Sequence, residues 1–121
     1  MIYAIHEHEL LPDVDLAAYE QDVAAAIRKM QVPGLLQAVH LKGMGGKRSG
    51  QYAVFWLFES ADALTRNFGT PEARKFPPDW LYYENEVLTK YLDRHPDTIE
   101  YTDYTIVNDF SFAKELAGGN E

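Results

Sequence analysis

The strongest pattern in the sequence is a run of seven apolar residues at positions 52–58 (YAVFWLF), between Gly50 and Glu59. The run is too short for a long helix and is rich in aromatic and β-branched residues, which favours a strand. Because successive side chains point to opposite faces of a strand, both faces of this one are apolar. We therefore expect a sheet that needs a cover on each side.

Shorter patterns predict the elements around this strand. Alternating apolar residues indicate further strands at 2–8, 35–42 and 99–107. A first helix is expected to begin at Asp13 or Asp15, since either carboxylate can accept free N–H groups of the first turn, and to end at Pro33. Its apolar residues recur at helical spacing: Leu16, Tyr19, Val23, Ile27 and Met30.

The segment after the apolar strand predicts further helical structure. Ser60 is placed to cap a helix that ends at Gly69. The Thr-Pro pair at 70–71 predicts another helical turn. Two prolines interrupt the chain at 77–78, and Asp79 is expected to cap a helix over 80–94.

The order of these elements is β-α-β-β-α-β, which predicts an α+β, ferredoxin-like fold with four antiparallel strands and both helices on one face. The helices then leave one apolar face of strand 52–58 uncovered. A large apolar face marks an interaction site, so we expect a homodimer in which two sheets pack together as a dimeric α/β barrel. Residues 1–107 are expected to form a single domain and residues 108–121 a C-terminal tail.

Composition narrows the partners and the chemistry. The net charge is −8, from 19 acidic residues against 11 Lys and Arg, so nucleic acids and anionic membranes are not expected as partners. No apolar stretch approaches about 20 residues, and no export signal is evident, so a cytoplasmic protein is expected. The chain has no cysteine, which excludes disulfides, thiol catalysis and cysteine-ligated zinc.

Histidines are the first candidates for chemistry. His6 and His8 lie about 7 Å apart on one face of the first strand, where they could serve as a base, metal ligands or a substrate clamp. Alternatively, His8 lies at a solvated strand end and His6 is a hydrogen-bonded cavity residue. His40 would be a third metal ligand, but strand 52–58 separates it from the first strand by about 10 Å, so we expect no bound metal. We assign His6 and His40 as catalytic candidates and His8 as a substrate contact.

Aromatic side chains are the second group of candidates. Tyr52, Trp56 and Tyr104 could line a pocket for a flat or aromatic ligand, although such residues also dominate cores and dimer interfaces. Trp80 could form the rim of the same pocket or simply pack. The glycine-rich, basic loop at 43–50 is either a lid with cationic contacts or a solvated hairpin tip.

Several short motifs resemble those of a known superfamily. They are Pro33-Gly34-Leu35, Phe58-Glu59-Ser60, Ala63-Leu64, Thr70-Pro71 and Phe76. Over residues 1–107 the chain resembles the dimeric α/β-barrel superfamily, in particular its antibiotic-biosynthesis-monooxygenase-like branch. The resemblance does not extend to the haem-degrading branch, because Asn67 and Pro77 stand where that branch has its Trp and His.

The resemblance implies a small-molecule enzyme of the monooxygenase-like type that needs no cofactor. Such an enzyme deprotonates an electron-rich, aromatic or conjugated substrate, which then reacts with dioxygen, while the protein supplies a base and a dry cavity. The alternatives are a non-catalytic ligand-binding or stress-associated dimeric barrel, and a structural dimer without a pocket. A cavity with a buried histidine favours the enzyme, an apolar cavity without titratable groups favours binding, and a filled interior favours the structural role.

Overall fold

The computed structural model describes residues 1–92 and 99–112. Within them, four strands form an antiparallel sheet in the order β2-β3-β1-β6. The strands are β1 (Ile2–His8), β2 (Leu35–Lys42), β3 (Tyr52–Phe58) and β6 (Glu100–Thr105). The first three have the expected bounds, and β6 is shorter than the predicted 99–107.

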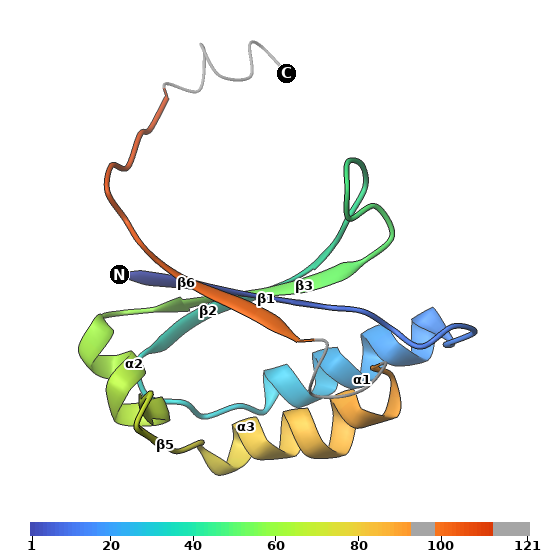
Figure 1. Cartoon of the computed structure of the whole chain (residues 1–121), viewed down its shortest axis with the longest axis horizontal. Helices are drawn as coiled ribbons and strands as arrows, with labels where there is room; N and C mark the ends of the chain where they lie inside the picture. The colour runs from blue at the N-terminus through green and yellow to red at the C-terminus, as the bar shows by residue number, and fades with distance from the viewer. Residues whose placement is uncertain (93–98, 113–121) are drawn as a thin grey trace.

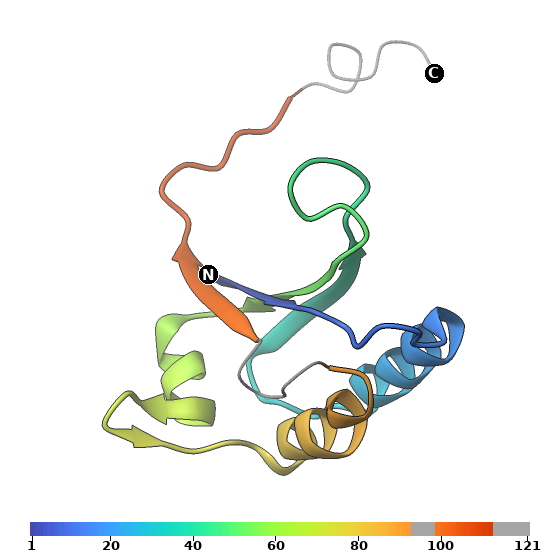
Figure 2. The same cartoon turned by 45° about the vertical axis from the view of Figure 1, so that its right-hand side comes forward.

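All helices lie on one face of this sheet (Figure 1). They are α1 (Leu16–Arg28), α2 (Ala61–Phe68) and α3 (Pro78–Tyr82), and α3 continues as a π-helix (Tyr83–Val87) and a 3₁₀-helix (Leu88–Lys90). Figure 2 shows α1 beside the segment that follows α3, with α2 at the other end of the sheet. The predicted α+β, ferredoxin-like fold with helices on one face is confirmed.

Two of the expected helix caps are confirmed. The Asp15 carboxylate accepts the N–H of Ala18 at 3.1 Å, and the Ser60 hydroxyl accepts the N–H of Ala63 at 3.0 Å. Each bond satisfies an N–H group that has no partner inside its helix. Asp13, the alternative cap of the first helix, lies in the preceding turn with a φ of 63°.

The helical turn predicted at the Thr-Pro pair is wrong. In its place, β4 (Gly69–Thr70) and β5 (Ala73–Arg74) form a small hairpin. The Thr70 hydroxyl accepts the N–H of Ala73 at 3.2 Å, which is the bond that a helix cap would make. Because Gly69 has a φ of 73°, the chain reverses direction there and α2 cannot continue into another turn.

The predicted cap of the third helix is also wrong. No side chain caps α3, which begins after Pro77, and the Asp79 carboxylate instead accepts the N–H of Gln31 at 2.8 Å. Asp79 therefore ties α3 to the segment that follows α1. The helix expected over 80–94 is present through Lys90 but changes to π geometry at Tyr83. Its expected end near Pro96, like residues 113–121 of the predicted tail, lies outside the described residues.

Strand β3 has two apolar faces, as its sequence predicts. Its even-numbered side chains are buried against the helices, and its odd-numbered side chains are only partly buried. The second face is not covered by any described part of the chain, and we call it the open face (Figure 1). The apolar side chains that register and exposure place there include Tyr3, Ile5, Phe55, Leu57 and Tyr104.

Candidate functional site

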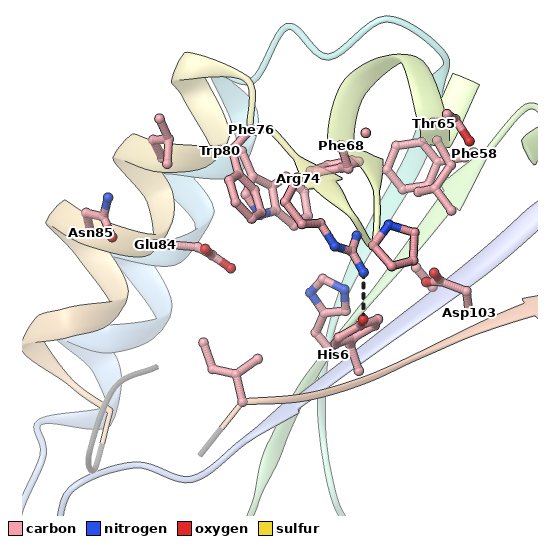
Figure 3. Close-up of a pocket in the computed structure, with 17 residues that line it drawn as sticks. His6, Phe58, Thr65, Phe68, Arg74, Phe76, Trp80, Glu84, Asn85 and Asp103 are labelled. Carbon is pink, nitrogen blue, oxygen red and sulfur yellow. Dashed lines mark hydrogen bonds between the residues drawn. The ribbon is translucent and has the colours of Figure 1, made fainter. Parts of the chain in front are cut away.

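A pocket of about 710 Å³ lies between the sheet and the helices (Figure 3). Strands β1, β3 and β6 form its floor, and α2, the β4–β5 hairpin and the segment after Pro77 form its walls. Exposed residues of the hairpin, among them Pro71 and Arg74, stand at its edge. It is lined by Ala4, His6, Phe58, Leu64, Thr65, Phe68, Gly69, Pro71, Arg74, Phe76, Trp80, Leu81, Glu84, Asn85, Ile99, Tyr101 and Asp103. Its size and largely apolar lining are typical of small-molecule sites.

His6 is the histidine that borders this pocket. Its ring lies edge-on to Trp80 and Tyr101, with centroid distances of 5.7 and 5.9 Å. Burial lowers the pKa of His6 to about 4, so the ring is neutral at neutral pH. Within the described residues its ring nitrogens make no hydrogen bond to protein, which leaves them available to a bound molecule.

Two carboxylates line the same pocket, Glu84 from the helical wall and Asp103 from β6. Burial raises the pKa of Glu84, although a hydrogen bond from the Trp80 side chain acts in the opposite direction. Burial also raises the pKa of Asp103, and the charge of Arg74 partly offsets this. Both acids therefore hold a proton more tightly than exposed carboxylates do.

Arg74 joins the hairpin to the sheet at the edge of the pocket. Its guanidinium donates to the Tyr101 hydroxyl at 2.9 Å and lies 5.9 Å from the centre of that ring (Figure 3). Register places Tyr101 opposite His6 on the neighbouring strand. The hairpin is thus held across the sheet by a contact that also forms one side of the pocket.

The other two candidate histidines lie in a separate cluster. The Tyr19 hydroxyl is 2.5 Å from Nε2 of His8 and 2.8 Å from Nε2 of His40, so it bridges the two rings. His8 is buried rather than solvated, with 1% of its surface exposed. Burial lowers the pKa of His8 to about 4 and also lowers that of His40. Neither ring lines the pocket, so their predicted roles in catalysis and substrate contact gain no support from its geometry.

The candidate aromatic residues are also outside the pocket lining. Tyr52 is buried beside Tyr19 and donates a hydrogen bond to Glu20; burial and this bond raise the pKa of Tyr52 to about 12. Trp56 is buried under Trp80, with ring centroids 4.5 Å apart, and its indole N–H has no hydrogen-bond partner among the described residues.

Tyr104 lies on the opposite side of the sheet from the pocket. It pairs with Tyr3 on the open face and has 52% of its surface exposed. The loop at 43–50 also extends away from the helices (Figure 1). Arg48 of that loop pairs with Glu7 at 3.1 Å and donates to the His8 carbonyl at 3.3 Å, so its contacts are with β1 and not with the pocket.

Sequence reasoning did not assign Arg74, Glu84 or Asp103 to the site. Nothing in their local patterns distinguishes them from surface charges, because the pocket is formed only when six elements of the fold come together. Trp80, for which the sequence allows a place either on the pocket rim or in simple packing, lines the pocket. Among the described residues, no group of three or more His, Asp or Glu side chains is arranged to hold a metal ion. In the same part of the chain, none of the helices has the length and apolar character required to cross a membrane.

Comparison with known proteins places this geometry in context. No protein-family model matches the sequence, and no curated protein matches it. Solved structures do match its fold. One is a dimeric ferredoxin-like protein of unknown function from Jannaschia sp. CCS1, with a TM-score of 0.64 and 14% identity, covering 87% of this chain and 98% of that one.

Two further matches carry names that refer to oxygenases. A protein from Deinococcus radiodurans, provisionally named an antibiotic biosynthesis monooxygenase, has a TM-score of 0.59 at 10% identity, covering 93% of this chain and 99% of its own. The N63A variant of SnoaB, a cofactor-independent oxygenase from Streptomyces nogalater, has a TM-score of 0.56 at 15% identity, covering 89% and 94%. The chain has the ferredoxin-like fold of dimeric ferredoxin-like and antibiotic-biosynthesis-monooxygenase-like proteins.

Proposed function

We propose that the chain is a small-molecule enzyme of the monooxygenase-like type and that the pocket between sheet and helices is its active site. The observation that carries this proposal is His6, a mostly buried ring whose nitrogens face an apolar pocket without a protein partner among the described residues. A purely structural core rarely leaves a buried polar ring in this state, because burial without hydrogen bonds costs free energy.

The pocket suits a flat aromatic or conjugated substrate. Phe68, Phe76 and Trp80 supply aromatic walls, and polar side chains reach the same space from both the helical wall and the sheet (Figure 3). In the proposed reaction a base removes a proton from an activated CH₂ group, and the resulting carbanion transfers its electrons to dioxygen. A C–O bond forms, the O–O bond breaks, and one oxygen leaves as water. The CH₂ group becomes a carbonyl, and no cofactor is consumed.

We include a homodimer in this proposal. The open face carries apolar side chains from β1, β3 and β6, and the Jannaschia protein with the same fold is dimeric. Two copies related by two-fold symmetry would bury these faces against each other and leave both pockets on the outer, helical sides. Each active site would then be formed within one chain.

One observation favours a second candidate function, a non-catalytic ligand-binding protein. With its pKa lowered to about 4, His6 is a weak base, so its neutral ring is better suited to donating or accepting a hydrogen bond than to removing a proton. The binding alternative uses the same pocket and the same substrate class.

Anthrone, a flat tricyclic ketone with an acidic CH₂ group, is a suitable probe for both candidates. We expect bound anthrone to quench the tryptophan fluorescence of the protein. We also expect the protein to accelerate oxygen uptake and anthraquinone formation above the rate without protein. Thr65→Phe, which fills the pocket from α2, should lose both effects, and Ala25→Phe on the exposed side of α1 should retain them. Quenching without oxygen uptake would favour the binding protein; neither effect would refute both candidates.

A further inference from the structure

The helical wall of the pocket contains a turn of unusual geometry. The helix that begins at Pro78 changes from α to π geometry over Tyr83–Val87. A π turn holds an extra residue, and such turns occur frequently at functional sites. Tyr83 and Val87 of this turn are buried in the core, while Glu84 lines the pocket. The widened turn is therefore the element that presents an acidic side chain to the pocket.

The carboxylate of Glu84 points from this turn into the space between helix and sheet (Figure 3). It is partly buried beside Trp80. The ion pairs within residues 1–92 and 99–112 are Arg48–Glu7 and Arg66–Glu59, and neither includes it. The cation of the pocket lining, Arg74, is hydrogen-bonded to Tyr101. Withdrawing a carboxylate from water without pairing it with a cation costs free energy. Carboxylates in this state are typical of functional sites.

Base strength distinguishes the groups that face the pocket. The titratable groups in its lining are His6, Arg74, Glu84, Tyr101 and Asp103. Burial disfavours the charged form of each side chain, so it weakens His6 as a base, with a pKa of about 4, and raises the pKa of Glu84 above its ordinary value of 4.5. The pKa of Asp103 rises from a lower value, 3.8, and the charge of Arg74 opposes that rise. Burial therefore makes Glu84 a stronger base and His6 a weaker one.

We propose that Glu84 is the proton acceptor of the pocket and that it takes the proton from an acidic C–H group conjugated with a carbonyl of the bound substrate. The C–H bond breaks, its electron pair remains on the substrate as an enolate, and the proton moves to a Glu84 oxygen. The enolate forms a C–O bond to dioxygen, and Glu84 returns its proton to the outer oxygen, which gives a hydroperoxide. Glu84 then removes the second C–H proton, the electron pair of that bond forms the carbonyl, and the O–O bond breaks. The outer oxygen leaves as water after taking this second proton from Glu84. His6 stays neutral and hydrogen-bonds to the substrate oxygen. This inference rests on the proposed function and assigns its central step to one residue.

Proton transfer can be measured separately from oxygen chemistry. In deuterated buffer without oxygen, the protein should accelerate exchange of the CH₂ protons of anthrone, followed by ¹H NMR against the rate without protein. Glu84→Gln removes the base while keeping its shape, and we expect it to lower the protein-dependent exchange rate about 100-fold or more. Glu86→Gln changes an exposed acid of the same turn that does not line the pocket, and should exchange like the unmodified protein.

Further readouts separate a catalytic role from a structural one. Glu84→Gln should bind anthrone within about twofold of the unmodified protein, and Glu84→Asp should recover part of the exchange rate. The unmodified protein should exchange faster as pH rises through the pKa of Glu84, and Glu84→Gln should lack that dependence. If the unmodified protein exchanges anthrone and Glu84→Gln does so equally well, the assignment of Glu84 is wrong while the proposed function stands. If the unmodified protein shows neither binding nor exchange, both are wrong.

Discussion

A chain of three hydrogen-bonded side chains connects the sheet to α1: His8, Tyr19 and the partly buried His40. A phenol has one proton, so the Tyr19 hydroxyl donates to one ring and accepts from the other. The two neutral rings therefore adopt opposite tautomers at Nε2. A proton added to either ring would introduce a charge into an aromatic cluster that also includes Tyr52 and Tyr91.

The histidines predict a loss of stability on acidification. The folded-state pKa values of His6 and His8 are about 4, whereas an unfolded histidine titrates near 6.5. Between these values the unfolded chain binds more protons, so stability is complete above pH 6.5 and falls as pH decreases toward 4. For His8 the effect is on the order of 3 kcal/mol at most. Urea unfolding should show a lower midpoint at pH 5.5 than at pH 7.5.

The same measurement has an internal control. In His8→Gln the difference between the two midpoints should shrink, because one of the two groups no longer titrates. Equal midpoints for the unmodified protein at pH 7.5 and 5.5 would contradict the neutral, buried state of these rings.

At the scale of elements, the close approach of α2 to the turn before β2 depends on one glycine. Gly34 has a φ of 85°, and a Cβ atom there would lie 2.6 Å from the Cβ of Ala63. Gly34→Ala should therefore lower the free energy of unfolding by more than about 1 kcal/mol, measured by urea denaturation. Gly45→Ala in the loop between β2 and β3 meets no atom within 4 Å and should have little effect. A similar stability for both variants would show that α2 does not approach the turn at Gly34 this closely.

The elements also show what the sequence can predict. Strands 2–8 and 35–42 are recoverable from the alternation of apolar residues that burial against the helices imposes, and strand 52–58 is recoverable from its continuous apolar run. The hairpin at 69–74 is not, since Thr70 and Pro71 fit a helix start and a tight turn equally well. The π turn has no sequence signal, and it positions Glu84.

The candidate site was predictable only in part. His6 is identifiable because every second side chain of a strand faces the interior, and the alternation places His6 among them. The pocket partners of His6 come from segments far apart in the sequence, and only the tertiary structure brings them together. His8 and His40 show the converse case, since the strand spacing separates them while Tyr19 from α1 bridges the gap.

At the scale of the whole molecule, the open face predicts assembly. Phe55 faces away from the helices, so Phe55→Asp should leave the chain folded and convert a dimer into a monomer, because a buried, unpaired carboxylate would oppose the contact. Sedimentation velocity at micromolar concentration measures this. Ala25→Asp, on the exposed surface of α1, should remain dimeric. A monomer for the unmodified protein would refute the proposed dimer.

The most direct test of the central claim is to locate the probe on the protein. We would measure nuclear Overhauser effects between anthrone ring protons and assigned aromatic side chains. The account predicts contacts with Phe68, Trp80 and His6 in the pocket. Contacts confined to Phe55 and Tyr104 would place the probe on the open face and contradict the proposed active site.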